Sequence, residues 1–222
     1  MQLFRSILSR RMLALILCAI LIYVNAFTSV KVFAKVCTNQ PAFRCTANKQ
    51  AEADQAHNND LAITAKAAVL IDNASGRILY AKNKDKKLIP ASITKIMTLL
   101  LIFESIEQGK CKLEDKVTVS EYAASMGGSQ VFLEPGETQD VNTMIKCISI
   151  ASANDAAVAM AEHLAGSEQS FVKRMNKKAK ALGMKHTHFK NCNGLDDSIE
   201  SGHYSSAYDV ALMSQSLVSK YP

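Results

Sequence analysis

The sequence predicts an α/β or α+β fold in which a cluster of helices packs on an antiparallel sheet. Three observations lead to this expectation. An apolar run, Ala67–Ile71, is followed by turn residues and a second strand-like run, Arg77–Tyr80, as in a β-hairpin whose first strand is buried. The segment Ser92–Gln108 is apolar almost all round, which predicts a helix at the centre of the domain. Further helical patterns then follow between residues 140 and 218.

Four shorter helices are expected after the central one, most of them with a recognisable cap or stop. Asp140 is placed to cap the first of them, Asp155 opens the second, and Ser167 caps the third. Glycine ends the second and third helices, as is typical of helix C-termini. A strand is expected over Lys116–Ser120. The four helices are expected over residues 140–150, 155–166, 167–183 and 207–218.

The first 34 residues have the pattern of a secretory signal peptide. Arg5, Arg10 and Arg11 precede an uncharged apolar run, Met12–Phe27, and a small-residue cleavage site follows at residues 32–34. An uncleaved membrane anchor is the alternative, because the apolar run is nearly long enough to span a bilayer. In either form the rest of the chain is expected outside the cytoplasmic membrane, in the cell envelope or extracellular space, with membrane association if the anchor stays.

Composition limits what the exported part does. The 222 residues are 48% hydrophobic and 21% charged, as in ordinary globular proteins. Residues 35–60 are polar and are expected to form a linker, which leaves residues 61–222 as the folded domain. Residues 1–34 carry four of the positive charges, so the net charge of +6 becomes 6 − 4 = +2 after their removal. The sequence has no tryptophan and no basic stripe with interleaved aromatics, so no nucleic-acid partner is expected.

Cysteine and histidine spacing does not predict a metal site. The six cysteines include no C-x-x-C pair, and Cys18 lies in the signal segment. Cys37 and Cys45 could pair after export, Cys147 is expected to be a small core residue, and the odd remaining count leaves at least one thiol free or paired between chains. Four histidines are expected to be structural or surface residues: His163, His186, His188 and His203.

Ser92 and Lys95 form an S-x-x-K motif at the start of the central helix. Residues three apart share a helix face, so the hydroxyl and the amine are expected within hydrogen-bond reach. A serine becomes an effective nucleophile when a base takes its proton, and burial would lower the pKa of Lys95 enough to make it that base. The helix N-terminus would stabilise developing negative charge, with the Ser92 N–H as one oxyanion donor. A second copy, Ser170–Lys173, is expected on a solvated helix face.

A second motif, Ser152-Ala153-Asn154, begins 152 − 92 = 60 residues later, in a polar break between two apolar helices. Alone it would be an ordinary Ser/Asn cap before Asp155. S-x-x-K on a buried helix followed by S-x-N between helices is, however, the ordered pair found in penicillin-binding proteins and class A β-lactamases.

With these motifs, the chain from about Ala67 to Pro222 resembles the serine D-alanyl-D-alanine carboxypeptidases, which are low-molecular-mass penicillin-binding proteins. The resemblance rests on four segments: Pro90–Met97, Ile150–Ala156, Asn193–Leu195 and Gly202–Ser205. It implies a β-lactamase/transpeptidase-like fold. It also implies removal of the terminal D-alanine from peptidoglycan stem peptides, acylation by β-lactams, and no metal or organic cofactor.

The resemblance also implies a role for each motif residue. Ser92 would be the acylated nucleophile and Lys95 the general base. Ser152 would relay a proton toward the leaving D-alanine, and Asn154 would hold the substrate's peptide carbonyl.

The family's third motif, Lys-Thr-Gly or a close variant, does not occur in the 222 residues. We therefore expect a site without the cationic group that binds the substrate carboxylate and without the second oxyanion N–H. Loss of one oxyanion donor alone costs about 10²–10³ in rate. The chain as written is expected to be truncated, inactive and poorly stable. Its C-terminal sheet strands would be missing, which would leave the hairpin at Ala67–Ile71 with an exposed edge.

Two other functions remain open at this stage. A class A β-lactamase would need a glutamate for deacylation and usually has Asp in its second motif, where this chain has Ala153. A non-catalytic, truncated relative that binds peptidoglycan would explain the missing third motif. Such a binder would have no use for Lys95 buried beside Ser92, and covalent labelling of Ser92 by a β-lactam separates the two.

Overall fold

The computed structural model describes residues 62–195 and 201–222, which belong to the unit Glu52–Pro222. The predicted signal peptide, the whole of the predicted linker, and Cys18, Cys37 and Cys45 lie outside the described residues. Within the described ranges, every helix is too short or too polar to cross a membrane.

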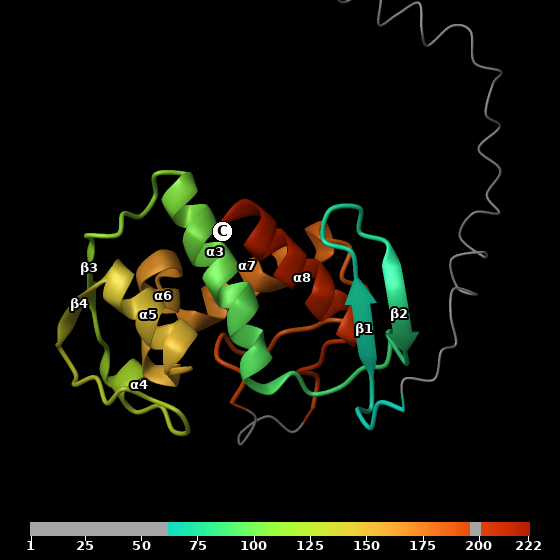
Figure 1. Cartoon of the computed structure of the whole chain (residues 1–222). Coiled ribbons are helices and arrows are strands. Elements are labelled where there is room, and N and C mark those ends of the chain that lie inside the picture. The colour runs from blue at the N-terminus through green and yellow to red at the C-terminus, as the bar shows by residue number, and fades with distance from the viewer. Residues whose placement is uncertain (1–61, 196–200) are drawn as a thin grey trace, which may run out of the picture. The chain divides into compact units, whose positions relative to one another are not determined.

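A long helix at the centre of this unit organises the fold (Figure 1). A 3-10 turn, η1 (Ala91–Thr94), leads directly into α3 (Lys95–Glu107). Helix α3 contacts the four other long helices and buries Met97, Leu100 and Ile102 completely. The predicted central helix is therefore confirmed, except that Ser92 lies on the 3-10 turn that precedes it.

Two of the surrounding helices begin at the predicted capping residues. The side chains of Asp140 and Ser167 accept hydrogen bonds from the N–H groups of Thr143 and Ser170, and Gly166 ends its helix with φ = +76°. A short helix within a predicted loop region, α4, was not expected. The helices are α4 (Glu121–Ala124), α5 (Val141–Ile150), α6 (Asn154–Ala165), α7 (Glu168–Ala181) and α8 (Ala207–Lys220).

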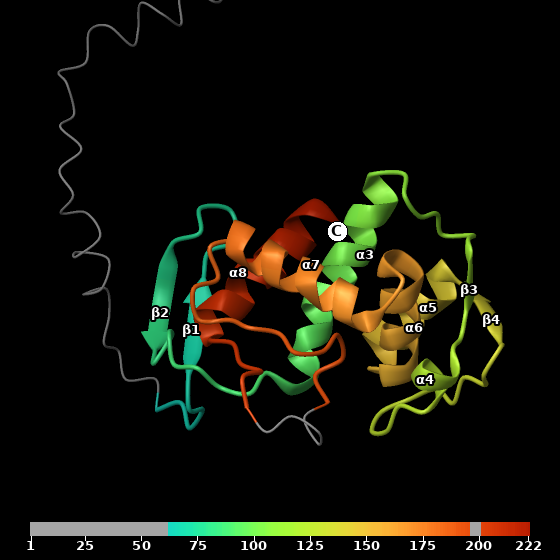
Figure 2. The same ribbon diagram turned by 180° about the vertical axis from the view of Figure 1, so that it is seen from behind.

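Two small antiparallel sheets flank the helices on opposite sides (Figures 1 and 2). Strands β1 (Ala68–Ile71) and β2 (Ile78–Lys82) form the predicted hairpin, which lies against α8. Strands β3 (Lys116–Thr118) and β4 (Thr138–Asp140) form the other sheet. Helices packed against small antiparallel sheets are the architecture that the sequence predicts.

The prediction that the first strand is buried is wrong. Leu70, in the middle of β1, is 55% exposed, and the other residues of the strand are only partly buried. Because α8 packs on the hairpin and the side chains of a strand alternate between two faces, one face of β1 remains in solvent. Within the described part of the chain β1 pairs with β2 alone, so its second edge is unpaired.

Candidate active site

Lys95 lies at the centre of a buried hydrogen-bond network at the N-terminal end of α3. Its Nζ atom is 2.6 Å from Oδ1 of Asn154, 2.8 Å from the carbonyl oxygen of Asn193 and 3.3 Å from Oγ of Ser92. The lysine is 3% exposed, whereas Ser92 is exposed to solvent. The contact with Ser92 is the one that the S-x-x-K spacing predicts.

Burial sets the protonation of this lysine. It lowers the pKa of Lys95 to about 8, because an ammonium group withdrawn from water loses solvation. In the described part of the chain no carboxylate forms an ion pair with Lys95, so no such pair stabilises its ammonium form. With this pKa about a tenth of the amine is neutral at pH 7.

Hydrogen bonds fix both the side-chain amide and the backbone of Asn154. Its Nδ2 donates to the carbonyl of Gly127 at 2.7 Å, which turns Oδ1 toward Lys95. Its backbone N–H donates to the carbonyl of Ser129, also at 2.7 Å. The resemblance assigned Asn154 to the substrate, and the contact with Lys95 was not foreseen.

Asp155 ties the neighbouring loop to the start of α6. Its carboxylate, which is fully buried, accepts hydrogen bonds from the backbone N–H groups of Val131, Leu133 and Ala156. These bonds hold the loop that carries Gly127, and so support the position of Asn154. Helix α6 begins one residue earlier than predicted, at Asn154 with Ala153 as its N-cap, so Asp155 lies in the first turn and organises the site.

The third partner of Lys95 comes from a loop after α7 that approaches the backbone beside Ser92. Gly194 has φ = +84°, and a Cβ atom there would lie 1.9 Å from the carbonyl oxygen of Ala91. The hydroxyl of Thr98 donates to the carbonyl of Cys192 at 2.5 Å and fastens the same loop to α3. The Asn-Gly pair at residues 193–194 was recognised as a loop, but its contact with Lys95 was missed.

Ser152 stands apart from this network. It lies in the break between α5 and α6, is half-buried, and has a left-handed backbone with φ = +56°. Its hydroxyl makes no hydrogen bond to any residue of the ranges that the structure describes. The structure therefore joins Ser92, Lys95 and Asn154 of the four predicted site residues, and leaves the side chain of Ser152 available.

His203 supports the motif from behind. Its Nδ1 accepts the backbone N–H of Lys190 at 3.1 Å, so its Nε2–H is the donor to Oγ1 of Thr94 at 2.9 Å. His203 is 5% exposed, and Thr94 is fully buried. The expectation that His203 is a structural residue agrees with this position.

An exposed serine whose hydroxyl contacts a buried lysine amine is the arrangement expected of a serine acyl-transfer site with a lysine base. The chain belongs to the D-alanyl-D-alanine carboxypeptidase family of serine peptidases, whose family model matches residues 50–222.

Known proteins of the same kind are similar in sequence and fold. D-alanyl-D-alanine carboxypeptidase DacF of Bacillus subtilis is 58% identical over 168 residues, which are 76% of this chain and 42% of that protein. The crystal structure of DacD from Francisella tularensis matches with a TM-score of 0.69 and 37% identity, covering 72% of this chain and 38% of the other. Penicillin-Binding Protein D2 of Listeria monocytogenes in its ampicillin-bound form matches with a TM-score of 0.65 and 30% identity, covering 73% and 65%.

These matches confirm the predicted penicillin-binding, transpeptidase-like fold and the predicted family. The chain spans about two fifths of the length of the curated relatives that it matches.

Proposed function

We propose that the protein is a serine D-alanyl-D-alanine carboxypeptidase, which removes the terminal D-alanine from peptidoglycan stem peptides through an acyl-enzyme on Ser92. The observation that carries this proposal is the set of three contacts of the Lys95 amine. Asn154 Oδ1 and the Asn193 carbonyl only accept hydrogen bonds, so they take the two N–H groups of a neutral amine. The nitrogen lone pair then faces the hydroxyl of Ser92, whose proton it can accept.

In the proposed reaction Ser92 Oγ attacks the carbonyl carbon between the last two D-alanine residues. The new O–C bond forms as the serine proton moves to Lys95, and the Ser92 N–H at the start of the helical segment donates to the oxyanion. The C=O bond then re-forms, the C–N bond breaks, and the amine of the departing D-alanine takes the proton from Lys95 through Ser152, which returns Lys95 to its neutral form. Water afterwards hydrolyses the ester and returns Ser92 to its free form.

Asn154 is proposed to hold the peptide carbonyl of the substrate. One N–H of its amide donates to Gly127, and we assign the other to the substrate. This role joins binding to catalysis, since the same amide orients Lys95.

The proposal extends to inhibitors and to location. The ampicillin-bound state of the Listeria relative supports acylation of Ser92 by β-lactams. The arginines and apolar run of residues 1–34 support export, with residues 12–27 holding the protein at the membrane if they are retained.

The test is release of D-alanine from a peptide ending in D-Ala-D-Ala, using the protein at the full length that its gene encodes. Ser92→Ala and Lys95→Ala are each expected to lower the rate by about 10³-fold or more. Lys173→Ala, at the exposed lysine of the second S-x-x-K copy, is the matched control and is expected to keep the normal rate. Equal rates for the wild type and Ser92→Ala would refute the proposal, and binding of the peptide without release would favour the non-catalytic alternative.

A further inference from the structure

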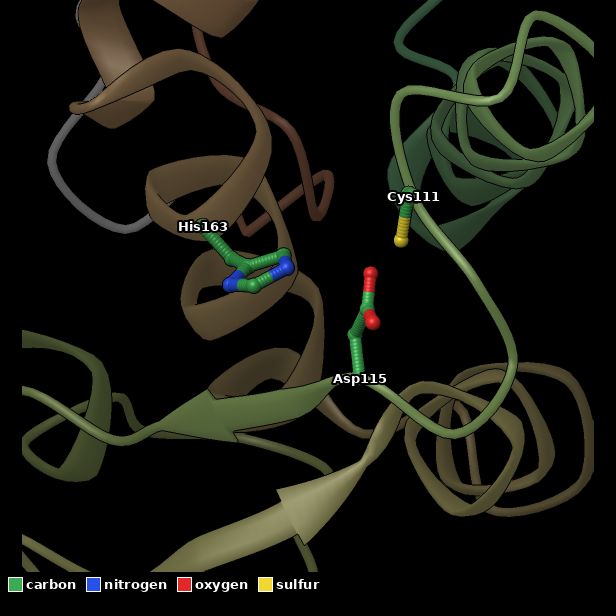
Figure 3. Close-up of side chains that lie close together, drawn as sticks. All are labelled: Cys111, Asp115 and His163. Atoms are coloured by element: carbon green, nitrogen blue, oxygen red, sulfur yellow. The ribbon is translucent and has the colours of Figure 1, made fainter.

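A second group of reactive side chains lies at the other end of α3, away from Ser92. Cys111 and Asp115 belong to the loop between α3 and β3, and His163 lies in the last turn of α6. Sγ of Cys111, a carboxylate oxygen of Asp115 and a ring nitrogen of His163 all lie within 4.8 Å of one another. Figure 3 shows the three side chains directed toward a common point.

The types of atom in this cluster select a class of metal ion. A thiolate, an imidazole and a carboxylate together suit a borderline cation such as Zn²⁺, whereas Mg²⁺ and Ca²⁺ prefer oxygen ligands only. Zinc–ligand bonds of about 2.0–2.3 Å place neighbouring ligand atoms roughly 3.3–3.6 Å apart. On binding, the ligand atoms would therefore approach one another by about 1 Å. The exposed side chain of His163 can supply this shift by rotation.

The electrostatic surroundings also favour a cation. The carboxylate of Asp115 brings negative charge to this group of side chains. No lysine or arginine forms an ion pair with Asp115 among residues 62–195 and 201–222. His163 lies at a helix C-terminus, where the unpaired carbonyl groups attract positive charge.

Two of the three groups are already held in place. Oδ2 of Asp115 accepts the backbone N–H of Lys112 at 2.8 Å, and the backbone carbonyl of Asp115 accepts the N–H of Val141. Cys111 is 2% exposed and packs within the core. Such supporting contacts orient ligands before a metal binds.

We propose that Cys111, Asp115 and His163 bind one Zn²⁺ ion, with water as the fourth ligand. The ion would fasten the loop between α3 and β3 to the end of α6. Formation of the Zn–S bond requires the thiolate, so the Cys111 proton passes to the solvent and the affinity rises with pH. The site is separate from the acyl-transfer reaction, and its test does not depend on that activity.

The experiment is a calorimetric titration of the reduced, EDTA-treated, full-length protein with Zn²⁺ at two pH values. We expect one saturable site that is tighter at the higher pH, and at least about tenfold weaker in His163→Gln. His163 is exposed, so this variant is expected to fold normally. His186→Gln is the matched control. Binding that is unchanged in His163→Gln, or absent from the wild type, would overturn the proposal.

Cobalt provides a second, spectroscopic readout of the thiolate. Co²⁺ in the site is expected to show a thiolate-to-metal charge-transfer band in the wild type. The band should also appear in the control Cys147→Ser, because Cys147 is a half-buried free thiol elsewhere in the fold. The band should disappear in Cys111→Ser. A band that persists in Cys111→Ser would assign the metal to other cysteines of the chain and contradict the proposal.

Discussion

Nζ of Lys95 lies 2.6 Å from Oδ1 of Asn154 and 3.3 Å from Oγ of Ser92. Asn154 thus makes the shorter contact with Lys95, although Ser92 is the residue that gives its proton to Lys95 in the proposed reaction. Because Gly127 fixes the orientation of the amide, Asn154 would in the proposed reaction direct the amine hydrogens and leave the lone pair for Ser92.

The rate of acylation should follow the titration of Lys95. Its pKa is about 8, and only the neutral amine can accept the serine proton. The second-order rate of acylation by a β-lactam is therefore expected to rise with pH through about 8 and then level off. At pH 7 it should be about a tenth of the plateau. Stopped-flow measurements between pH 6 and pH 10 check this, and a rate that falls as the pH rises through 8 would refute it.

Replacing Asn154 with aspartate tests the link between the two motifs. A carboxylate in contact with the Lys95 amine favours the ammonium form, so the pKa of Lys95 should rise by about 1–3. In Asn154→Asp the midpoint of the acylation profile is expected to move to higher pH by the same amount. Asn142→Asp, at an exposed position in the first turn of α5, is the control. A slower rate with an unchanged midpoint would show that Asn154 does not govern the base.

Gly194 is expected to tolerate no side chain. Gly194→Ala places a Cβ atom 1.9 Å from the Ala91 carbonyl, and must displace the backbone next to Ser92. Gly183→Ala is the control, because its φ of +76° carries the same backbone strain with no atom within 4 Å of the new Cβ. The control should lose about 1–2 kcal/mol of unfolding free energy.

Gly194→Ala should lose more stability than this control, and its acylation should slow by about 10²-fold through misplacement of Ser92. Urea denaturation and acylation kinetics measure the two effects. Equal behaviour of the two variants would contradict the close approach at Gly194.

The hydrogen bond between Thr94 and His203 should stabilise the turn that carries Ser92. Thr94→Val removes the acceptor of a buried ring N–H, at an expected loss of about 1–3 kcal/mol. A double-mutant cycle with His203→Phe should give a coupling energy of about 0.5–3 kcal/mol, since the pair is in direct contact. Denaturation of the four proteins gives this number, and additive losses would mean that the bond contributes nothing.

The elements set by local sequence were predictable. Helical spacing and caps such as Asp140 and Ser167 located the helices, because both signals act within a few residues. Strand β4 was not predicted, since three polar residues form a strand here only through pairing with β3. The burial of β1 was overestimated because it depends on which elements cover the hairpin, and periodicity does not report this.

The contacts of the site likewise include some that sequence spacing predicts and others that only the fold creates. The contact between Ser92 and Lys95 spans one turn and follows from their spacing. The contact between Lys95 and Asn193 was not predictable, because its acceptor is a backbone carbonyl that every residue type possesses. His163 gave no ligand signal, since it is 48 residues from Asp115 and only the fold brings them together.

The most direct test of the account is to locate the covalent label left by a β-lactam. The wild-type protein, at the full length that its gene encodes, is incubated with ampicillin, and intact mass and peptide mapping then identify the modified residue. We predict one added ampicillin mass on the peptide that contains Ser92, and no such addition in Ser92→Ala or Lys95→Met. Labelling of a different residue, or labelling that survives in Ser92→Ala, would contradict the assignment of Ser92 as the nucleophile.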